Sequence, residues 1–372
     1  MKARLDQKIM CAAFCVFLVL MSCLFFLLPK EDFSELEKRY LAETPEFSWS
    51  NLTSGELGED IETYMADHVP GRNFFVGLNA YADLLTGRQV TKGVYLAAGD
   101  RLVQSPVLWN EAQAKQNTAA ISAFAQSIDV PVDFMVIPSA GWAARDSIIG
   151  LSDSYMDESL IELLYAYCGS NIRTIDIAQI FSEWGDPASL YYRTDHHWTT
   201  EGAYLAYQTY MQALGREYAT RDTFQIQTVS GFQGSTYSES ALWMVPGEDL
   251  ELWHGSSALT VTNGESKEIH DGVFYEERLD EADKYTVYLD GNHSIVRIEN
   301  PEITGKLLVI RDSYSNCLGT LLAESYGTVV LVDLRYYKNP VSALLQEEAF
   351  DNVLVCYSME NIMTDTNLVW LK

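Results

Sequence analysis

Short apolar runs alternate with longer segments of helical spacing along much of the chain. The runs typical of buried strands are Val132–Pro138, Ile172–Ile177, Lys306–Ile310, Thr328–Leu334 and Asn352–Ser358. Helical spacing covers Asn110–Ile128 and Asp157–Cys168, and a further helical stretch follows Ser313. This order predicts an α/β fold in which helices flank a parallel sheet. The nearly continuous apolar strands suit a sheet that is buried on both faces.

The segment from Phe224 to Glu299 has a different pattern. It is richer in Gly, Ser and Asp, and it contains the β-like runs Lys284–Gly291 and His293–Glu299. The turn residues Asp290-Gly291-Asn292 between these runs predict a hairpin. We therefore expect a β-rich insertion, at about 224–299, at the edge of the α/β core.

The N-terminal pattern is that of a membrane-spanning helix. Residues Ile9–Leu28 carry no charge, and twenty apolar residues suffice to cross a bilayer. Because a small-x-small cleavage site is missing, an uncleaved signal anchor is favoured over a cleaved signal peptide. Lipoprotein processing at Cys23 is disfavoured, since the apolar run continues past it. The basic leader, residues 1–8, should stay in the cytoplasm, although Lys38 and Arg39 weaken the charge asymmetry.

These patterns divide the chain into four expected segments. A cytoplasmic leader (1–8) precedes the transmembrane signal anchor (9–28), and a juxtamembrane helical segment (29–92) leads to the α/β domain (93–372). We expect a single-pass protein of the cell membrane whose main domain lies on the extracytoplasmic side.

Composition and charge exclude several functions. A hydrophobic content of 48% among 372 residues is that of a folded protein with a core. The net charge of −27, without a basic patch, makes nucleic acid or an anionic lipid surface an unsuitable partner. Three of the six cysteines lie in the apolar N-terminal run, and the other three are far apart in the sequence, so they predict neither disulfides nor a thiolate metal site.

Two of only six histidines stand side by side in the stretch TDHHWTTEG, residues 194–202. In an extended or turn conformation, Asp195 and His197 can project to the same side while His196 points elsewhere; in an extended segment His196 lies on the opposite side. A carboxylate next to an imidazole is what a serine nucleophile needs, because the imidazole takes the serine proton and the carboxylate fixes its tautomer. A metal site would require a third ligand from elsewhere, and no ligand spacing supplies one. We therefore expect neither a metal nor another cofactor.

Ser313 is the candidate nucleophile. It follows the apolar run Lys306–Ile310 and precedes a helical stretch, which places it at the carboxyl end of a strand, where open α/β folds build their sites. The alternative is that Ser313 only caps the following helix.

The sequence Asp195–Trp198 resembles the signature of bacterial DHHW proteins. Together with Asp312–Ser315 it is similar to the SGNH-hydrolase-like domains of exported alginate O-acetyltransferases. The resemblance implies Ser313 as nucleophile, His197 as base and Asp195 as orienting acid. It also implies a circularly permuted motif order, since the serine comes last here. Arg311 departs from the pattern, because a small residue is frequent at that position.

Further site residues are expected with competing interpretations. The backbone N–H groups of Ser313 and Tyr314 could bind an oxyanion, and Gly234, in a Gly-rich loop, could approach the substrate. Ser139 ends a predicted strand and could line the cleft. For Gly234 and Ser139 an ordinary turn is the alternative. His196 and Trp198 are expected to support the site from behind.

Three functions are compatible with these patterns. The resemblance implies an exported, membrane-anchored O-acyltransferase that moves an acetyl group onto a cell-surface or secreted polysaccharide. It also implies a multi-pass membrane acyltransferase partner that supplies acyl groups. A carbohydrate esterase would use the same triad with water as acceptor, and a non-catalytic polysaccharide-binding protein would carry the triad as a remnant.

Overall fold

The computed structural model describes all residues except 1, 35–38, 265, 267 and 372. The described chain forms two compact units. One comprises residues 1–91 and 238–243, and the other comprises residues 92–237 and 244–372. Lys38, one of the two basic residues that weaken the charge asymmetry across the apolar run, lies outside the described residues.

The first unit is mainly helical. Its elements are α1 (Lys2–Leu27), β1 (Phe33–Ser34), β2 (Arg39–Tyr40), α2 (Trp49–Ser54), α3 (Glu56–His68), α4 (Arg72–Leu85) and β3 (Val90–Thr91). Within α1, the stretch Asp6–Leu27 is long and apolar enough to cross a membrane, as an anchor or a signal sequence would be. It is the one such helix in the described part of the chain.

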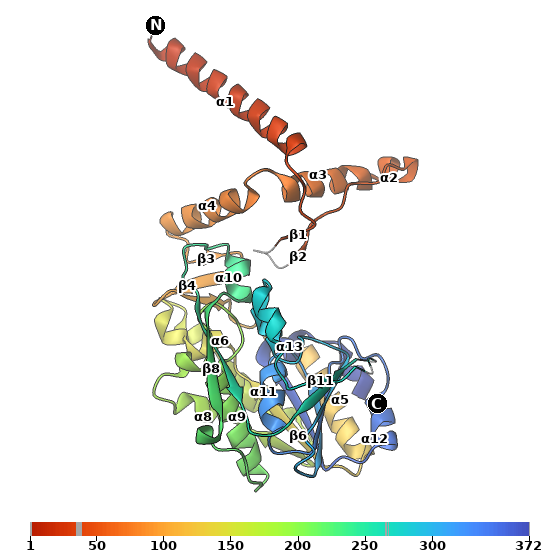
Figure 1. The fold of residues 1–372 in the computed structure, drawn as a ribbon. Helices are drawn as coiled ribbons and strands as arrows, with labels where there is room; N and C mark the ends of the chain where they lie inside the picture. The colour runs from red at the N-terminus through yellow and green to blue at the C-terminus, as the bar shows by residue number, and fades with distance from the viewer. Residues whose placement is uncertain (1, 35–38, 265, 267, 372) are drawn as a thin grey trace. The chain divides into compact units, whose positions relative to one another are not determined.

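An eight-stranded sheet organises the second unit (Figure 1). Its strands, in spatial order, are β11 (His270–Asp271), β10 (Thr260–Asn263), β12 (Ile295–Glu299), β14 (Thr328–Val332), β13 (Lys306–Arg311), β15 (Asn352–Ser358), β6 (Val132–Ile137) and β7 (Ile172–Ile175). The five strands from β14 to β7 are parallel, and the other three are antiparallel. Every residue of β6, β14 and β15 is buried, as the apolar runs predicted. The expected α/β class with a mostly parallel sheet is confirmed.

Helices flank this sheet (Figure 1). Among them, α9 packs on α11, and α5 packs on α7 and α13. The helices of this unit are α5 (Glu111–Ser127), α6 (Ala140–Ala143), α7 (Asp157–Tyr167), α8 (Ile177–Ser182), α9 (Thr200–Ala213), α11 (Ser315–Leu322), α12 (Val341–Glu347) and α13 (Met359–Thr364). Helix α10 (Ser235–Ser240) crosses the boundary between the two units. Two antiparallel pairs complete the strands: β4 (Val94–Ala97) with β5 (Arg101–Gln104), and β8 (Gln225–Phe232) with β9 (Glu248–His254).

The predicted hairpin between residues 284 and 299 is wrong. Residues Lys284–Val287 form the short 3₁₀ helix η6, and β12 pairs with β10 and β14 instead. Leu289, Asp290 and Gly291 all have positive φ angles, so three consecutive residues turn the chain away from an extended path. Tyr285 and Tyr288 are both buried, which an exposed two-stranded ribbon would not allow.

The packing of Gly202 fixes where the Asp195–Trp198 loop meets α9. A Cβ atom at Gly202 would lie 2.4 Å from the backbone oxygen of Leu190, which already accepts a hydrogen bond from the Thr199 N–H. The end of the loop and the start of α9 are therefore close to the backbone that precedes the loop.

We expect Gly202→Ala to lower the free energy of unfolding by about 1–3 kcal/mol, because backbone must move to admit the methyl group. Chemical denaturation measures this change. Gly185→Ala is the matched control, since a Cβ atom there meets nothing within 4 Å. Equal unfolding midpoints for the two variants would contradict the packing argument.

Candidate active site

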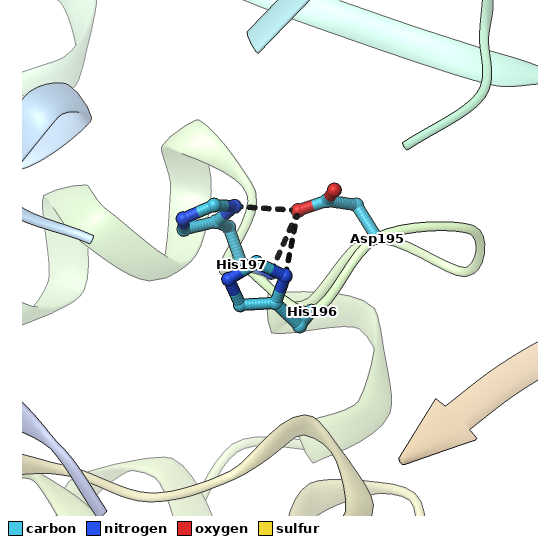
Figure 2. A group of neighbouring side chains, drawn as sticks. All are labelled: Asp195, His196 and His197. Carbon is cyan, nitrogen blue, oxygen red and sulfur yellow. Dashed lines mark hydrogen bonds and ion pairs between the residues drawn. The ribbon is translucent and has the colours of Figure 1, made fainter. Parts of the chain in front are cut away.

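The Asp195–Trp198 segment is a tight loop rather than an extended strand. Its ends are closed by an antiparallel bridge between Tyr191 and Trp198, and the Tyr192 N–H donates to the His197 carbonyl at 3.2 Å. Because the loop is bent, the side chains of both histidines lie together (Figure 2).

Ser313 lies just after β13, in the turn that leads to α11. The neighbouring carboxylate of Asp312 fixes this turn, since it accepts hydrogen bonds from the Ser358 N–H at 2.7 Å, the Asn361 side-chain amide at 2.8 Å and the Tyr314 N–H at 3.2 Å. Asp312 is fully buried and joins the ends of two adjacent strands, β13 and β15. Ser313 is therefore held at the carboxyl edge of the sheet.

Asp195, His197 and Ser313 form a continuous chain of hydrogen bonds. The Nδ1 atom of His197 lies 2.6 Å from Asp195 Oδ1, and its Nε2 atom lies 2.8 Å from Ser313 Oγ. A carboxylate only accepts hydrogen bonds, so the imidazole proton is on Nδ1 and Nε2 can accept the serine hydroxyl. This geometry can draw the proton from Ser313 and make its oxygen nucleophilic.

Backbone donors hold the Asp195 carboxylate in place. Its Oδ1 also accepts from the His197 N–H at 2.8 Å, and its Oδ2 accepts from the Ser235 N–H at 2.6 Å. Gly234 packs directly on this carboxylate, because a Cβ atom at that position would lie 2.2 Å from Asp195 atoms. The structure therefore places Gly234 against the acid, which corrects the expectation that it approaches the substrate.

His196 does not lie on the opposite side of the loop, as the extended-segment argument predicted. Its ring centroid is 3.9 Å from that of His197, and its Nδ1 lies 2.5 Å from Ser235 Oγ. Its carbonyl accepts a hydrogen bond from the Tyr314 hydroxyl. The bend of the loop overrides the two-residue alternation on which the prediction depended.

The cluster of Asp195, His196 and His197 also has the composition of a metal site. One ligand atom from each lies within 4.8 Å of the others (Figure 2). However, ligands bound to Zn²⁺ at about 2.0–2.2 Å in a tetrahedron lie roughly 3.3 Å apart. The 2.6 Å between His197 Nδ1 and Asp195 Oδ1 is a hydrogen-bond distance instead. The geometry therefore favours a hydrogen-bonded pair over a metal centre.

Trp198 and Tyr314 lie behind the site. The Trp198 indole donates to the Tyr314 carbonyl at 3.1 Å, and the two rings meet edge to face. The Tyr314 N–H is already used by Asp312, which removes it from the expected oxyanion donors. The Ser313 N–H is the other backbone donor named from the sequence.

Ser139 caps α6, where its hydroxyl accepts the Trp142 N–H at 3.2 Å, and its own N–H donates to Asp157. It lines a small cavity that also touches His196 and Tyr314. The plain turn considered for Ser139 is thus closer to the structure than a direct substrate contact.

A cavity of about 370 Å³ opens at the hydroxyl of Ser313. Besides the three hydrogen-bonded residues, its lining includes Tyr285, Asn292, Asn316 and Arg335. Tyr285 and Asn292 belong to the β-rich segment, and neither was predicted as a site residue. No local motif marks them, because only the fold brings that segment to Ser313.

Arg311 orients Asn292. Its buried guanidinium donates to Asn292 Oδ1 at 2.9 Å, and the Asn316 amide donates to the same oxygen at 3.1 Å. Since a guanidinium can only donate, the Asn292 oxygen must face it, so the other end of the amide is an NH₂ donor group. Burial lowers the pKa of Arg311, and the nearby carboxylate of Asp333 opposes this effect. The residue that departed from the sequence pattern thus has a defined partner at the cavity.

Comparison with known proteins gives the family. The chain matches the family described as DHHW protein over residues 108–332. It belongs to the DHHW family. This match confirms the resemblance carried by Asp195–Trp198.

Two solved structures with TM-scores above 0.5 share the fold of this DHHW protein. A DHHW family protein from Eubacterium siraeum is 19% identical, with a TM-score of 0.67, over 76% of this chain and 95% of that one. Bacillus cereus PatB1 with a sulfonyl adduct is 21% identical, with a TM-score of 0.64, over 75% of this chain and 98% of that one. The O-acetyltransferase domain of Pseudomonas putida AlgJ is 13% identical, with a TM-score of 0.48, over 75% and 95%. No curated protein sequence matches the chain.

The hydrogen-bonded arrangement predicts that zinc does not bind tightly at this loop. Calorimetric titration of the metal-free chain with Zn²⁺ should therefore detect no micromolar binding site at this loop. Any zinc binding that is observed should persist in His196→Ala and in His197→Ala. A site that disappears in each of these variants would favour the metal centre and contradict the hydrogen-bonded pair.

Proposed function

We propose that this DHHW protein is an O-acyltransferase that transfers an acetyl group to a polysaccharide through Ser313, His197 and Asp195. The observation that carries the proposal is the 2.8 Å contact between His197 Nε2 and Ser313 Oγ, in line with the Asp195 carboxylate. The sequence resemblance to exported polysaccharide O-acetyltransferases supports the choice of reaction.

The reaction has two steps. In the first, Ser313 Oγ attacks the carbonyl carbon of an acetyl ester while His197 Nε2 takes the serine proton. The donor's leaving group departs with that proton, and an acetyl-serine remains. In the second step, His197 takes the proton of a sugar hydroxyl, the sugar oxygen attacks the acetyl carbon, and Ser313 recovers its proton. Asp195 balances the positive charge on His197 in both steps.

Negative charge develops on the carbonyl oxygen in both steps. The Ser313 N–H and the Asn292 NH₂ group are the donors that we assign to this oxygen, with Arg311 holding the Asn292 amide in orientation. Donors that are fixed before the reaction stabilise the transition state without reorganisation.

The apolar stretch Asp6–Leu27 would hold the protein in the membrane as a signal anchor. With the leader 1–8 in the cytoplasm, the segment 29–92 and the domain 93–372 would lie outside, where polysaccharide is modified. Acetyl donors are cytoplasmic, so a multi-pass membrane acyltransferase partner would deliver the acetyl group.

Ser313→Ala should reduce acetyl transfer from 4-nitrophenyl acetate to an oligosaccharide at least about a thousandfold, because it removes the nucleophile. The full chain in detergent is assayed for both the acetylated sugar and free acetate. Ser315→Ala is the matched control, since Ser315 is a buried serine two residues further along the chain and it does not line the cavity at Ser313.

Equal rates for wild type and Ser313→Ala would contradict the proposed function. Free acetate without acetylated sugar would instead indicate a carbohydrate esterase with the same triad. Glycan binding with no turnover in either protein would indicate a binding protein.

Asn292→Ala should lower kcat about a hundredfold with little change in KM, because the donor acts on charge that exists only in the transition state. Arg311→Lys should also lower kcat, since an ammonium does not reproduce the geometry with which the guanidinium orients Asn292. Steady-state kinetics with the ester substrate measures both. A rise in KM at constant kcat would show that Asn292 only binds the ground state.

A further inference from the structure

The ring of Tyr285 stacks on the imidazole of His197. The two ring centroids are 3.9 Å apart, and the planes differ by only 8°. The Tyr285 side chain is buried and lines the cavity beside Ser313. While Asp195 and Ser313 bind the two nitrogens at the edge of the imidazole, Tyr285 covers one of its faces.

The stacked position of Tyr285 is set by its surroundings. The ring contacts Tyr192 edge to face at 6.4 Å and Tyr288 at 5.1 Å. The helix that carries it, η6, is attached by a hydrogen bond from the Tyr275 N–H to the Val287 carbonyl at 2.8 Å. These contacts hold the ring in place beside His197.

The aromatic face, rather than the hydroxyl, makes the contact. The Tyr285 hydroxyl is buried and has no hydrogen-bond partner among the described residues. A hydroxyl in that situation contributes nothing favourable to stability. Tyr285→Phe therefore removes an unused group and retains the stack, which makes it the matched control for removal of the ring.

The face of an aromatic ring attracts a cation. His197 becomes an imidazolium each time it takes a proton from Ser313 or from the acceptor, so the stack is stronger in the charged state than in the neutral one. The flat contact also restricts rotation of the imidazole, which keeps Nδ1 at Asp195 and Nε2 at Ser313.

We propose that Tyr285 is a positioning residue that stabilises the imidazolium form of His197 and fixes the plane of its ring. The inference rests on the proposed function, in which His197 is the base. It assigns a role in the reaction to the β-rich segment 224–299, which lies outside the parallel part of the sheet.

Other ionisable groups also surround His197. From its own loop these are Asp195 and His196, and the rings of Tyr285 and Tyr314 face it from other elements. The remaining charged residues of the cavity are Asp283, Arg335 and Glu360. All except Tyr285 stay unchanged in the variants below, so a change in pH dependence reports on the stacked ring.

The test compares Tyr285→Phe and Tyr285→Leu with wild type, as full chains in detergent. The kcat/KM for 4-nitrophenyl acetate is measured across pH, together with the titration of the His197 ring protons by NMR. Their signals are identified by their loss in His197→Gln. Tyr285→Phe should stay within about twofold of wild type at all pH values.

Tyr285→Leu should lower kcat/KM roughly fivefold to tenfold. In this variant, the acid limb of the kcat/KM profile and the NMR titration midpoint of the His197 ring should both move to lower pH by roughly half a unit to one unit. The reason is that a group that favours the protonated imidazole is lost. Tyr285→Met, which also lacks a ring face, should give the same shift and replaces Tyr285→Leu if that variant does not fold.

An unchanged midpoint in Tyr285→Leu and Tyr285→Met, or an equal shift in Tyr285→Phe, would overturn the inference. The NMR titration needs no turnover, so the two proposals can fail separately. Full activity in Ser313→Ala would refute the proposed function, whereas an inactive Ser313→Ala beside an unshifted Tyr285→Leu would refute only the role of Tyr285.

Discussion

The hydrogen bond between His197 Nε2 and Ser313 Oγ joins two segments that are 116 residues apart, and the arrangement of the site depends on it. Each partner is fixed by its own backbone. Ser313 is held by the Asp312 turn at the end of a buried strand, and His197 is held in a bent loop closed by Tyr191 and Trp198. Neither segment alone makes a site, and the sheet sets the distance between them.

A buried carboxylate makes this arrangement stable and directional. Asp195 is 2% exposed, and an unpaired charge at such a position would be strongly destabilising. The donors that compensate the lost hydration include two backbone N–H groups and the His197 ring. Because the carboxylate is held from both oxygens, it in turn fixes the tautomer and the orientation of the imidazole. The small size of Gly234 is what allows the backbone to approach this carboxylate.

The sequence predicted those parts of the fold that the burial of apolar side chains determines. Strands β13, β14 and β15 consist mostly of apolar residues because both of their faces are buried, and the carboxyl end of β13 places Ser313 at the sheet edge. The juxtaposition of Ser313 with His197 and Asp195 followed from residue types whose chemistry requires one another. Arg311 was noted only as a departure from the family pattern.

The sequence could not predict contacts that depend on bends and on distant segments. His196 was placed on the wrong side because the loop is not extended, and the hairpin failed because three residues with positive φ redirect the chain. Tyr285 and Asn292 were missed, since no spacing connects them to Ser313. The hydrogen bond from the Tyr314 N–H to Asp312 was also not predicted, because Asp312 lies in a turn whose geometry the sequence does not specify.

The central claim is that Ser313 carries the acyl group during turnover. Rapid quenching of the full chain with an acetyl ester, followed by peptide mass spectrometry, tests it most directly. The account predicts an acetyl group on Ser313 in wild type that disappears when an oligosaccharide acceptor is added, and no such group in His197→Ala. Turnover with no acetyl group at Ser313, or acetylation of Ser313 that is equally fast without His197, would contradict it.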